Sequence, residues 1–210
     1  MFEDLKKIQL EMARKVSLKD KYRIEELEYV IGVDQAFLED RIISAAVKFT
    51  YPELKEVESN FTIKEVEFPY IPTFLMFREG EPALSALKKI LNGKCIILVD
   101  GSGIAHPRRC GLATYIAIKT SEPSIGVTKR KLFGEEVKLG DGIFLKEGNE
   151  IIGSVLKSCK RCKPIYISPG SFVSVESSIE IVKSCIKGHK LPEPIRAAHN
   201  LANEVKSSHI

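Results

Sequence analysis

The run Cys95-Ile96-Ile97-Leu98-Val99 constrains the fold more than any other stretch of the sequence. An unbroken apolar run of this length is typical of a strand covered on both faces, as in the parallel sheets of α/β proteins. The strand ends on Asp100 and continues into a turn that reads GSGIAHPRRCGLA. A turn needs glycine residues, but it does not need a carboxylate, an imidazole and two guanidinium groups. This turn is therefore a candidate functional segment.

The order of elements around this strand predicts one mixed α/β domain over 1–210. Residues 29–37, 42–50 and 57–68 indicate an antiparallel meander, with a hairpin turn at 38–41. Apolar side chains at spacings of three and four predict an N-terminal helix over 2–16. Further helices are expected over 77–91, 109–118, 175–186 and 193–206. Further strands are expected over 95–99, 125–128, 163–168, and 137–145 with 150–156 as a hairpin.

Composition fits a globular protein with clustered positive charge. The chain has 210 residues, of which 44% are hydrophobic, and a formal net charge of +4. Such a chain can bury a proper core. Its basic residues gather at 108–109, 129–131 and 157–163, which suits a polyanionic partner, although such clusters are also ordinary solvated surface. No apolar run approaches the ~18 residues of a spanning helix, so we expect a cytoplasmic protein with no membrane partner.

The cysteine pattern gives a weak signal for metal or redox chemistry. There are five cysteines, and Cys159 and Cys162 form a lone CxxC. Completing that motif with Cys185 and His189 would not match a usual zinc spacing. We therefore expect free thiols in a reducing compartment.

Three acidic residues interrupt the hydrophobic pattern. Asp34 lies within YVIGVDQAF, Asp100 ends the apolar strand, and Glu79 lies near a helix start. Each has an ordinary alternative role: an exposed strand position, a turn cap, or a partner of the helix dipole. If the strands of Asp34 and Asp100 lie side by side, however, their carboxylates meet and call for a cation between them. Mg²⁺ or Mn²⁺ prefers oxygen ligands, and a centre of this kind ringed by Arg and Lys suits phosphoryl chemistry.

A series of sequence blocks resembles the endonuclease V family of deoxyinosine 3′-endonucleases over essentially the whole chain. The blocks are IGVDQAF, PYIPTFLMFREGEPAL, VDGSGIAHPRRCGLA, SIGVTKRKLFG, ISPGSFVSVESSIEIV and LPEPIRAAHNLA. The resemblance implies a ribonuclease-H-like α/β fold, whose central mixed sheet has three antiparallel strands and then parallel strands, with helices on both faces. It also implies metal-dependent nicking of DNA at the second phosphodiester bond 3′ to deoxyinosine, leaving 3′-OH and 5′-phosphate ends.

Two alternative functions stay open. Some members of the family prefer inosine in single-stranded RNA, so inosine-containing RNA is a second candidate substrate. A non-catalytic nucleic-acid-binding module of the same fold is the other alternative. The expected partner is DNA containing deoxyinosine, and the expected state is a monomer.

The resemblance implies a catalytic centre of five residues. Asp34 and Asp100 match the family's magnesium-binding aspartates, and Glu79 matches its third acidic residue, so all three are candidate ligands of Mg²⁺, or of Mn²⁺ as a substitute. His199 matches a position that completes the centre; without the resemblance it reads as a surface helix residue. Lys129 matches an active-site lysine, whose charge would offset the charge that develops on the phosphate.

The resemblance also implies a site for the damaged base. Tyr70 matches the aromatic residue of a wedge formed by Pro69, Tyr70, Ile71 and Pro72. Such a wedge would fill the space left when the base rotates out of the stack, although the same four residues also suit a hydrophobic corner of the fold. Gly101, Gly103 and His106 are expected to line the pocket for the base.

Several positions depart from the family's pattern or keep two interpretations. Ser171 stands where histidine is usual, and Thr73 follows the wedge where glycine is common. Thr128 precedes Lys129 where a small residue is usual. Arg108 and Arg109 either contact phosphate or tie the following helix to the sheet through buried carboxylates.

Overall fold

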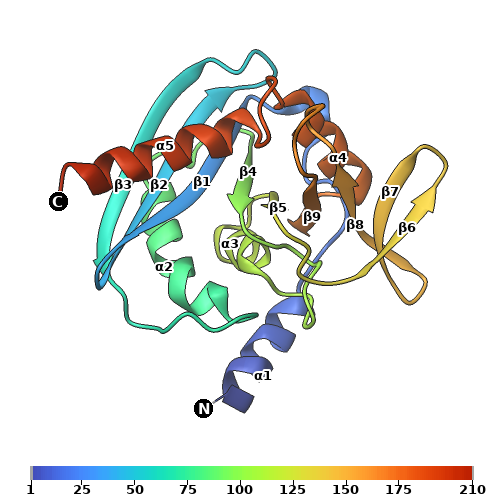
Figure 1. The fold of residues 1–210 in the computed structure, drawn as a ribbon, viewed down its shortest axis with the longest axis horizontal. Coiled ribbons are helices and arrows are strands. Elements are labelled where there is room, and N and C mark those ends of the chain that lie inside the picture. Colours follow the sequence, from blue (N-terminus) through green and yellow to red (C-terminus); the bar gives the residue numbers. More distant parts are fainter. Residues whose placement is uncertain (1, 210) are drawn as a thin grey trace.

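The computed structural model describes residues 2–209, and its strands form one twisted sheet (Figure 1). The strands are β1 (Tyr29–Leu38), β2 (Arg41–Thr50), β3 (Glu56–Glu65), β4 (Cys95–Asp100), β5 (Ser124–Thr128), β6 (Glu135–Leu139), β7 (Gly142–Glu147), β8 (Glu150–Leu156) and β9 (Ile165–Ser171). The helices are α1 (Phe2–Ala13), α2 (Leu75–Leu87), α3 (Leu112–Thr120), α4 (Val175–Ser184) and α5 (Glu193–Ser207), with a short 3-10 turn at Ile24–Glu26.

The sheet is mixed, as the sequence predicts. Its strand order is β3-β2-β1-β4-β5-β9-β8-β7-β6. Strands β1, β2 and β3 form the expected antiparallel meander, and β1, β4 and β5 are parallel to one another. Beyond β5 the sheet continues antiparallel through β9, β8, β7 and β6. The carboxyl ends of β1, β4 and β5 therefore lie at the same edge of the sheet.

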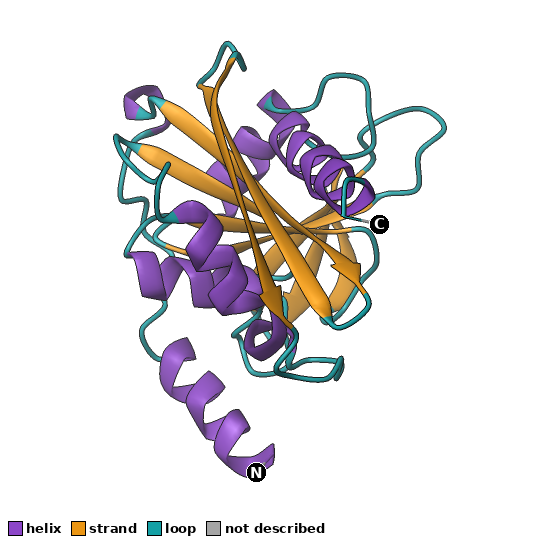
Figure 2. Ribbon diagram, turned by 90° about the vertical axis from the view of Figure 1, so that its left-hand side faces the viewer, coloured by secondary structure: helices purple, strands orange, loops and turns teal. Residues whose placement is uncertain are grey.

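Helices cover both faces of the sheet, which confirms the expected layers (Figure 2). One core cluster joins α1, α2 and α3 to the sheet, and a second joins α4 and α5 to the opposite face. Strand β4 supplies both clusters: Ile97 and Val99 point into the first, whereas Ile96 and Leu98 point into the second. Because each of these side chains is buried, each contributes roughly 1.5–3 kcal/mol to the free energy of unfolding.

Some element boundaries differ from the sequence predictions. The expected strand over 137–145 is two strands, β6 and β7, because Gly140 adopts a left-handed backbone (φ 59°) and begins a turn there. Helix α3 begins at Leu112 instead of residue 109, since Arg109 is also left-handed (φ 55°) and cannot continue a helix. Helix α2 begins two residues earlier than expected, at Leu75.

The expectation of free thiols is wrong for two cysteines. Cys159 and Cys162 form a disulfide in the loop between β8 and β9. A tight turn, in which the N–H of Cys162 donates to the carbonyl oxygen of Cys159, places their Cα atoms 5.2 Å apart. That separation lies within the ~4.4–6.8 Å that a disulfide requires. The remaining cysteines, Cys95, Cys110 and Cys185, are free, as expected, and the structure buries all three.

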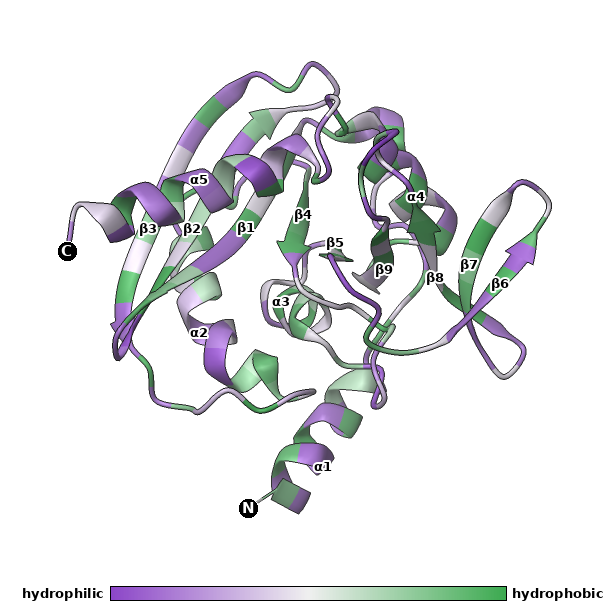
Figure 3. Cartoon of the chain, in the orientation of Figure 1, coloured by the Kyte–Doolittle hydropathy of each residue, from purple (hydrophilic) through white to green (hydrophobic). Residues whose placement is uncertain are grey.

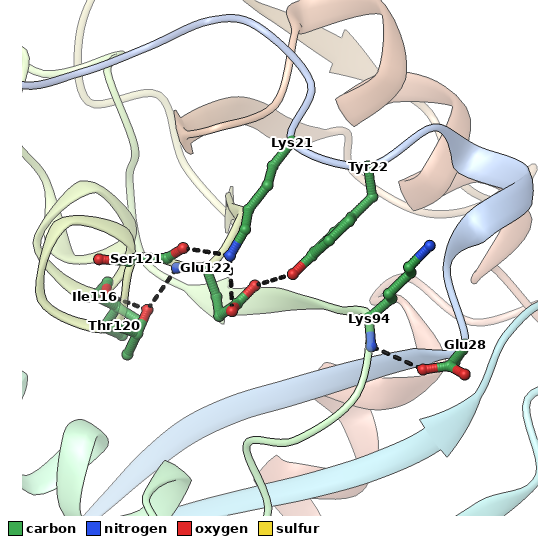
Figure 4. Close-up of polar contacts among 8 residues, drawn as sticks. All are labelled: Lys21, Tyr22, Glu28, Lys94, Ile116, Thr120, Ser121 and Glu122. Atoms are coloured by element: carbon green, nitrogen blue, oxygen red, sulfur yellow. Dashed lines mark hydrogen bonds and ion pairs between the residues drawn. The ribbon is translucent and has the colours of Figure 1, made fainter.

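The segment between α1 and β1 is fastened at the amino ends of the parallel strands (Figure 4). Lys21 Nζ lies 2.8 Å from Glu122 Oε1, and the Tyr22 hydroxyl donates to the other oxygen of the same carboxylate. The N–H of Lys94 donates to Glu28 Oε2 at 2.8 Å, which joins the residues preceding β1 and β4. These contacts lie at the edge opposite the carboxyl ends of β1 and β4. Among residues 2–209, no helix has the length and apolarity needed to cross a membrane.

Candidate active site

The structure places Asp34 and Asp100 on neighbouring strands. Val33 of β1 pairs with Val99 of β4, so the next residue on each strand is an aspartate. Neighbouring strands lie about 4.8 Å apart, and side chains alternate between the two faces. Both aspartates therefore share the face to which Leu98 points, and α5 covers this face. The sequence expectation that these two strands lie side by side is confirmed.

Glu79 joins the pair from α2 and makes the centre strongly acidic. Burial, and after it the charges of Asp100 and Asp34, raise the pKa of Glu79 to about 8, although Arg78 opposes the shift. Burial and the charge of Asp100 raise the pKa of Asp34 to about 6, against the backbone N–H of Gln35 and the imidazole of His199. Both pKa values are raised because burial and the neighbouring carboxylates outweigh the positive groups nearby, so negative charge at this centre is not fully compensated.

His199 is held against the acidic centre by α5. Its Nδ1 lies 2.7 Å from Asp34 Oδ2, and its Nε2 lies 3.2 Å from the side-chain nitrogen of Asn203. Helix α5 can approach β1 this closely because Gly32 has no side chain: a Cβ at that position would lie 1.9 Å from the carbonyl oxygen of Pro194. The close approach of α5 to β1 explains how a residue distant in sequence reaches Asp34.

Lys129 neutralises part of the acidic centre from the end of β5. Its Nζ lies 2.8 Å from Asp100 Oδ2. Burial lowers the pKa of Lys129, but the carboxylates of Asp100 and Asp34 outweigh burial and hold that pKa above its ordinary value. The ammonium group therefore stays charged beside Asp100, and its catalytic role stays a prediction.

The donor set fits a divalent cation. The Glu79 residue is 7% exposed, and within the described part of the chain its carboxylate forms no hydrogen bond or salt bridge. The charges of Asp100 and Asp34 oppose its ionisation, and carboxylate oxygens clustered in this way are the ligands that Mg²⁺ or Mn²⁺ prefers. The side chains are not drawn together as they would be around an ion: among residues 2–209, no three His, Cys, Asp or Glu side chains form a ready metal-binding group. Lys129 and His199 each engage one aspartate oxygen in this conformation.

The expected wedge is exposed beside a cavity. Tyr70 lies in the loop between β3 and α2, and the residue is 69% exposed. The adjacent cavity of about 100 Å³ is lined by residues of the wedge loop, of α1, of the start of α2, of the turn after β4, of the start of α3 and of the loop after β5. They are Gln9, Tyr70, Ile71, Pro72, Thr73, Leu75, Met76, Ser102, His106, Cys110, Gly111, Leu112 and Leu132. An exposed aromatic residue beside a largely apolar cavity is the arrangement that base rotation needs.

The expected pocket residues divide into two groups. His106 lines the cavity, whereas Gly101 and Gly103 lie outside its lining, so their contact with the base stays a prediction. The reason is close packing: a Cβ on Gly103 would lie 2.1 Å from the carbonyl oxygen of Pro169 in β9, and one on Gly101 would lie 3.1 Å from the Leu112 side chain. These glycines allow the turn after β4 to pack against its neighbours. Pro69 also lies outside the cavity lining.

A buried hydrogen-bond network holds the wedge, and the sequence interpretation missed it. The carbonyl oxygen of Thr73 accepts hydrogen bonds from Gln9 Nε2, Arg108 Nη2 and the His106 ring, each at 2.9 Å. Burial lowers the pKa of His106 to about 4. Because the N–H of Arg108 donates to His106 Nδ1, the proton of this neutral ring is on Nε2. Gln9 lies four residues after Leu5, on the apolar face of α1. A polar residue on an apolar helix face indicates a buried hydrogen bond, and this was the sequence signal for the network.

Thr73 occupies a strained backbone position. Its φ of 69° lies in the left-handed region, where glycine is favoured and another residue costs about 1–2 kcal/mol. The three hydrogen bonds to its carbonyl offset that cost. Threonine can therefore replace glycine at this position because the same hydrogen bonds hold the backbone that follows the wedge.

The two arginines of the turn after β4 have structural partners. Arg108 donates to Thr73 and to Gln9 Oε1, and its guanidinium group lies 4.5 Å from the centroid of the Phe74 ring. Arg109 pairs with Glu147 and Glu150, at the turn between β7 and β8. These glutamates are partly exposed, so Arg109 ties the turn to a hairpin through surface carboxylates, and not through buried carboxylates as one of the two interpretations proposed.

Ser171 also makes a structural contact. Its side chain is fully buried at the end of β9, and its hydroxyl accepts a hydrogen bond from the N–H of Ser17 at 2.9 Å. A serine therefore joins the segment after α1 to the sheet at the position where the resemblance expects a histidine.

A mixed sheet whose central parallel strands end in paired carboxylates, with a lysine and a histidine beside them, places the chain in the class of α/β nucleases. Comparison with known proteins specifies the family. The model of the Endonuclease V family matches residues 10–200. Endonuclease V of Archaeoglobus fulgidus is 58% identical over 205 residues, covering 97% of this chain and 93% of that protein. The chain belongs to the endonuclease V family.

Solved structures agree with this assignment. Endonuclease V from Streptomyces avermitilis superimposes with a TM-score of 0.90 at 29% identity, covering 100% of this chain and 94% of that one. Ciona intestinalis Endonuclease V, in complex with a 24mer DNA containing an inosine followed by a ribo-adenosine, gives a TM-score of 0.86 at 27% identity, covering 100% and 99%. The mixed sheet with helices on both faces is therefore the fold of this family.

Proposed function

We propose that this chain is a deoxyinosine endonuclease of DNA repair that nicks the second phosphodiester bond 3′ to the lesion and leaves 3′-OH and 5′-phosphate ends. Its membership of the endonuclease V family supports nuclease action on such DNA. The observation that carries the finer proposal is the acidic centre of Asp34, Asp100 and Glu79, with Lys129 beside it. Cutting away from the lesion requires separate sites for the base and for the phosphate, and the cavity beside Tyr70 supplies the first.

The cavity and the wedge act on the base. Tyr70 enters the stack where the base has left, at a small entropy cost because flanking prolines stiffen its backbone. The displaced base enters the cavity, whose apolar walls exclude water from its faces. The neutral His106 and the three hydrogen bonds to Thr73 keep the cavity wall in place.

The acidic centre acts on the phosphate. Asp34, Asp100 and Glu79 would hold the divalent cation, Mg²⁺ or Mn²⁺. When bound, that cation supplies a water of lowered pKa and neutralises charge on the phosphate oxygens. Lys129 places a fixed positive charge where negative charge develops on the phosphate. His199, hydrogen-bonded to Asp34 Oδ2, keeps that carboxylate oriented.

A nicking assay tests the proposal. A labelled deoxyinosine oligonucleotide is incubated with the wild type in Mg²⁺, in Mn²⁺ and in EDTA, and the product is sized against markers for each bond. We expect metal-dependent cleavage at the second bond, and we expect Asp34→Asn and Asp100→Asn to abolish nicking while binding persists. An Asp100→Asn protein that nicks without metal would refute the acidic centre.

Inosine-containing RNA is the second candidate substrate. The observation in its favour is that the Ciona intestinalis relative was solved with a strand in which a ribo-adenosine follows the inosine. Parallel cleavage of deoxyinosine DNA, the same strand with one ribonucleotide after the lesion, and inosine RNA decides between the substrates. Faster cleavage of the RNA than of the DNA at equal enzyme concentration would reverse our assignment.

A further inference from the structure

The loops that follow β5 and β8 carry six exposed cationic side chains that have no role in the catalytic centre described above. We call these residues the basic strip: Arg130, Lys131, Lys157, Lys160, Arg161 and Lys163. We propose that the basic strip binds successive phosphates of the substrate strand and extends the nucleic-acid site outward from Lys129. This inference rests on the proposed function, because it concerns the same substrate.

Strand pairing places the basic strip at the same edge of the sheet as the catalytic centre. Thr128, the last residue of β5, pairs with Tyr166 near the start of β9, and Leu156, the last residue of β8, pairs with Ile165. The two loops therefore leave the sheet where Asp100 ends β4. Figure 3 shows the strongly hydrophilic segment that follows β5. Across β4, β5, β9 and β8 the edge spans roughly 14 Å, at about 4.8 Å per strand.

The two loops share a hollow that begins at the catalytic lysine. A hollow of about 260 Å³ is lined by Lys129, Arg130, Lys131, Lys163, Pro164 and Tyr166. Lys129 also contacts Asp100 through its Nζ, so this one residue borders both the hollow and the acidic centre. An edge of roughly 14 Å matches about four nucleotides at the ~3.4 Å rise of one strand.

Most cations of the basic strip have no carboxylate partner. Within residues 2–209, only Lys131 of this set forms a salt bridge, at 3.6 Å from Glu136, and both side chains are about 40% exposed. Arg109, in contrast, pairs with two glutamates although its sequence context is equally basic. Unpaired cations beside a phosphodiester-cutting centre favour a polyanion over a structural role, because each phosphate contact releases a condensed counterion.

The disulfide gives the outer part of the basic strip a defined shape. Cys159 and Cys162 enclose Lys160 and Arg161, so these two cations stand at the tip of a closed turn. The preceding Ser158 donates to the carbonyl oxygen of Lys190 at 2.7 Å and fastens the loop to the segment after α4. A loop that is ordered before binding loses less entropy when it meets a strand.

The test compares the variant Lys160→Gln/Arg161→Gln/Lys163→Gln with the matched control Lys88→Gln/Lys89→Gln. The control lysines are exposed and follow α2, at the edge where β4 begins. Fluorescence anisotropy measures the Kd for a deoxyinosine oligonucleotide in EDTA at several salt concentrations. For the triple variant we expect a Kd raised at least about tenfold, and a slope of log Kd against log salt reduced by about 0.9 per lost contact. The control keeps the wild-type values.

A single-turnover nicking measurement separates the two proposals. At saturating enzyme, the control variant Lys88→Gln/Lys89→Gln cuts within about twofold of the wild-type rate, whereas at subsaturating enzyme the triple variant cuts more slowly in proportion to its raised Kd. If the wild type nicks deoxyinosine DNA but the triple variant keeps the wild-type Kd and salt slope, the basic strip is refuted and the proposed function stands. If the wild type does not nick, the proposed function fails, and the Kd and salt slope alone decide on the basic strip. An equal loss of affinity in the control would also refute the basic strip as a local site.

Discussion

Glu79→Gln tests the electrostatics of the acidic centre without reference to catalysis. Burial and the neighbouring aspartates raise the pKa of Glu79 from 4.5 to about 8. At about 1.36 kcal/mol per pKa unit, this difference corresponds to about 5 kcal/mol of stability that the folded state loses when the carboxyl ionises. Glutamine has nearly the same shape and cannot ionise, so it removes this loss.

The sign of the pH dependence follows from proton binding. Between pH 4.5 and 8 the folded chain keeps the Glu79 proton while the unfolded chain has lost it, so the free energy of unfolding falls as the pH rises through this window. Asp34, whose pKa is raised to about 6, adds a smaller fall of the same sign between pH 4 and 6. In Glu79→Gln, only the smaller fall in the free energy of unfolding, which comes from Asp34, remains.

Urea denaturation in EDTA at pH 5 and at pH 8.5 measures the effect. We expect the wild type to lose several kcal/mol more than Glu79→Gln between the two pH values, with the exposed Glu65→Gln on β3 as the control for loss of one charge. Added Mg²⁺ at pH 8.5 should stabilise the wild type more than Glu79→Gln. Parallel pH profiles for the wild type and Glu79→Gln would refute the argument.

Three further variants test other parts of the site. Lys129→Met removes the charge beside Asp100, and we expect the single-turnover nicking rate to fall by about 10²-fold or more with little change in Kd; an unchanged rate would contradict its placement. Tyr70→Ala should remove about 1–3 kcal/mol of stacking energy, measured as a loss of affinity for deoxyinosine DNA that is larger than the loss for the same strand without the lesion. Equal loss on both strands would argue against a wedge. Gln9→Leu leaves Arg108 and the Thr73 carbonyl short of a partner, and we expect a loss of about 1–3 kcal/mol in thermal denaturation.

The parts of the fold that the sequence predicts well are those set by local pattern. The apolar run of β4 predicts a strand covered on both faces, and the meander before it predicts the neighbour of β4 in the sheet. Together they predict that the strands of Asp34 and Asp100 lie side by side, which the register of β1 and β4 confirms. The break between β6 and β7 was missed because a single left-handed glycine, Gly140, decides it within a run of strand-like residues.

The parts that the sequence does not predict depend on contacts between distant residues. Gln9 and Thr73 are 64 positions apart, and no spacing rule connects an amide on the first helix to a wedge loop. The partners of Arg109 are likewise on a hairpin 38 positions or more further along the chain. Sequence pattern gives the residue types at a site, whereas the partner that each side chain selects is decided only when the elements pack.

The order of the sheet leaves β3 and β6 as its outermost strands. Open strand edges invite other chains to add on, and natural proteins oppose this with charged side chains. Both outer strands here carry exposed glutamate and lysine: Glu58 and Lys64 on β3, and Glu135 and Lys138 on β6. These charged side chains oppose the addition of a strand from another molecule at either edge, where Val57 and Phe61 on β3 and Leu139 on β6 are also exposed.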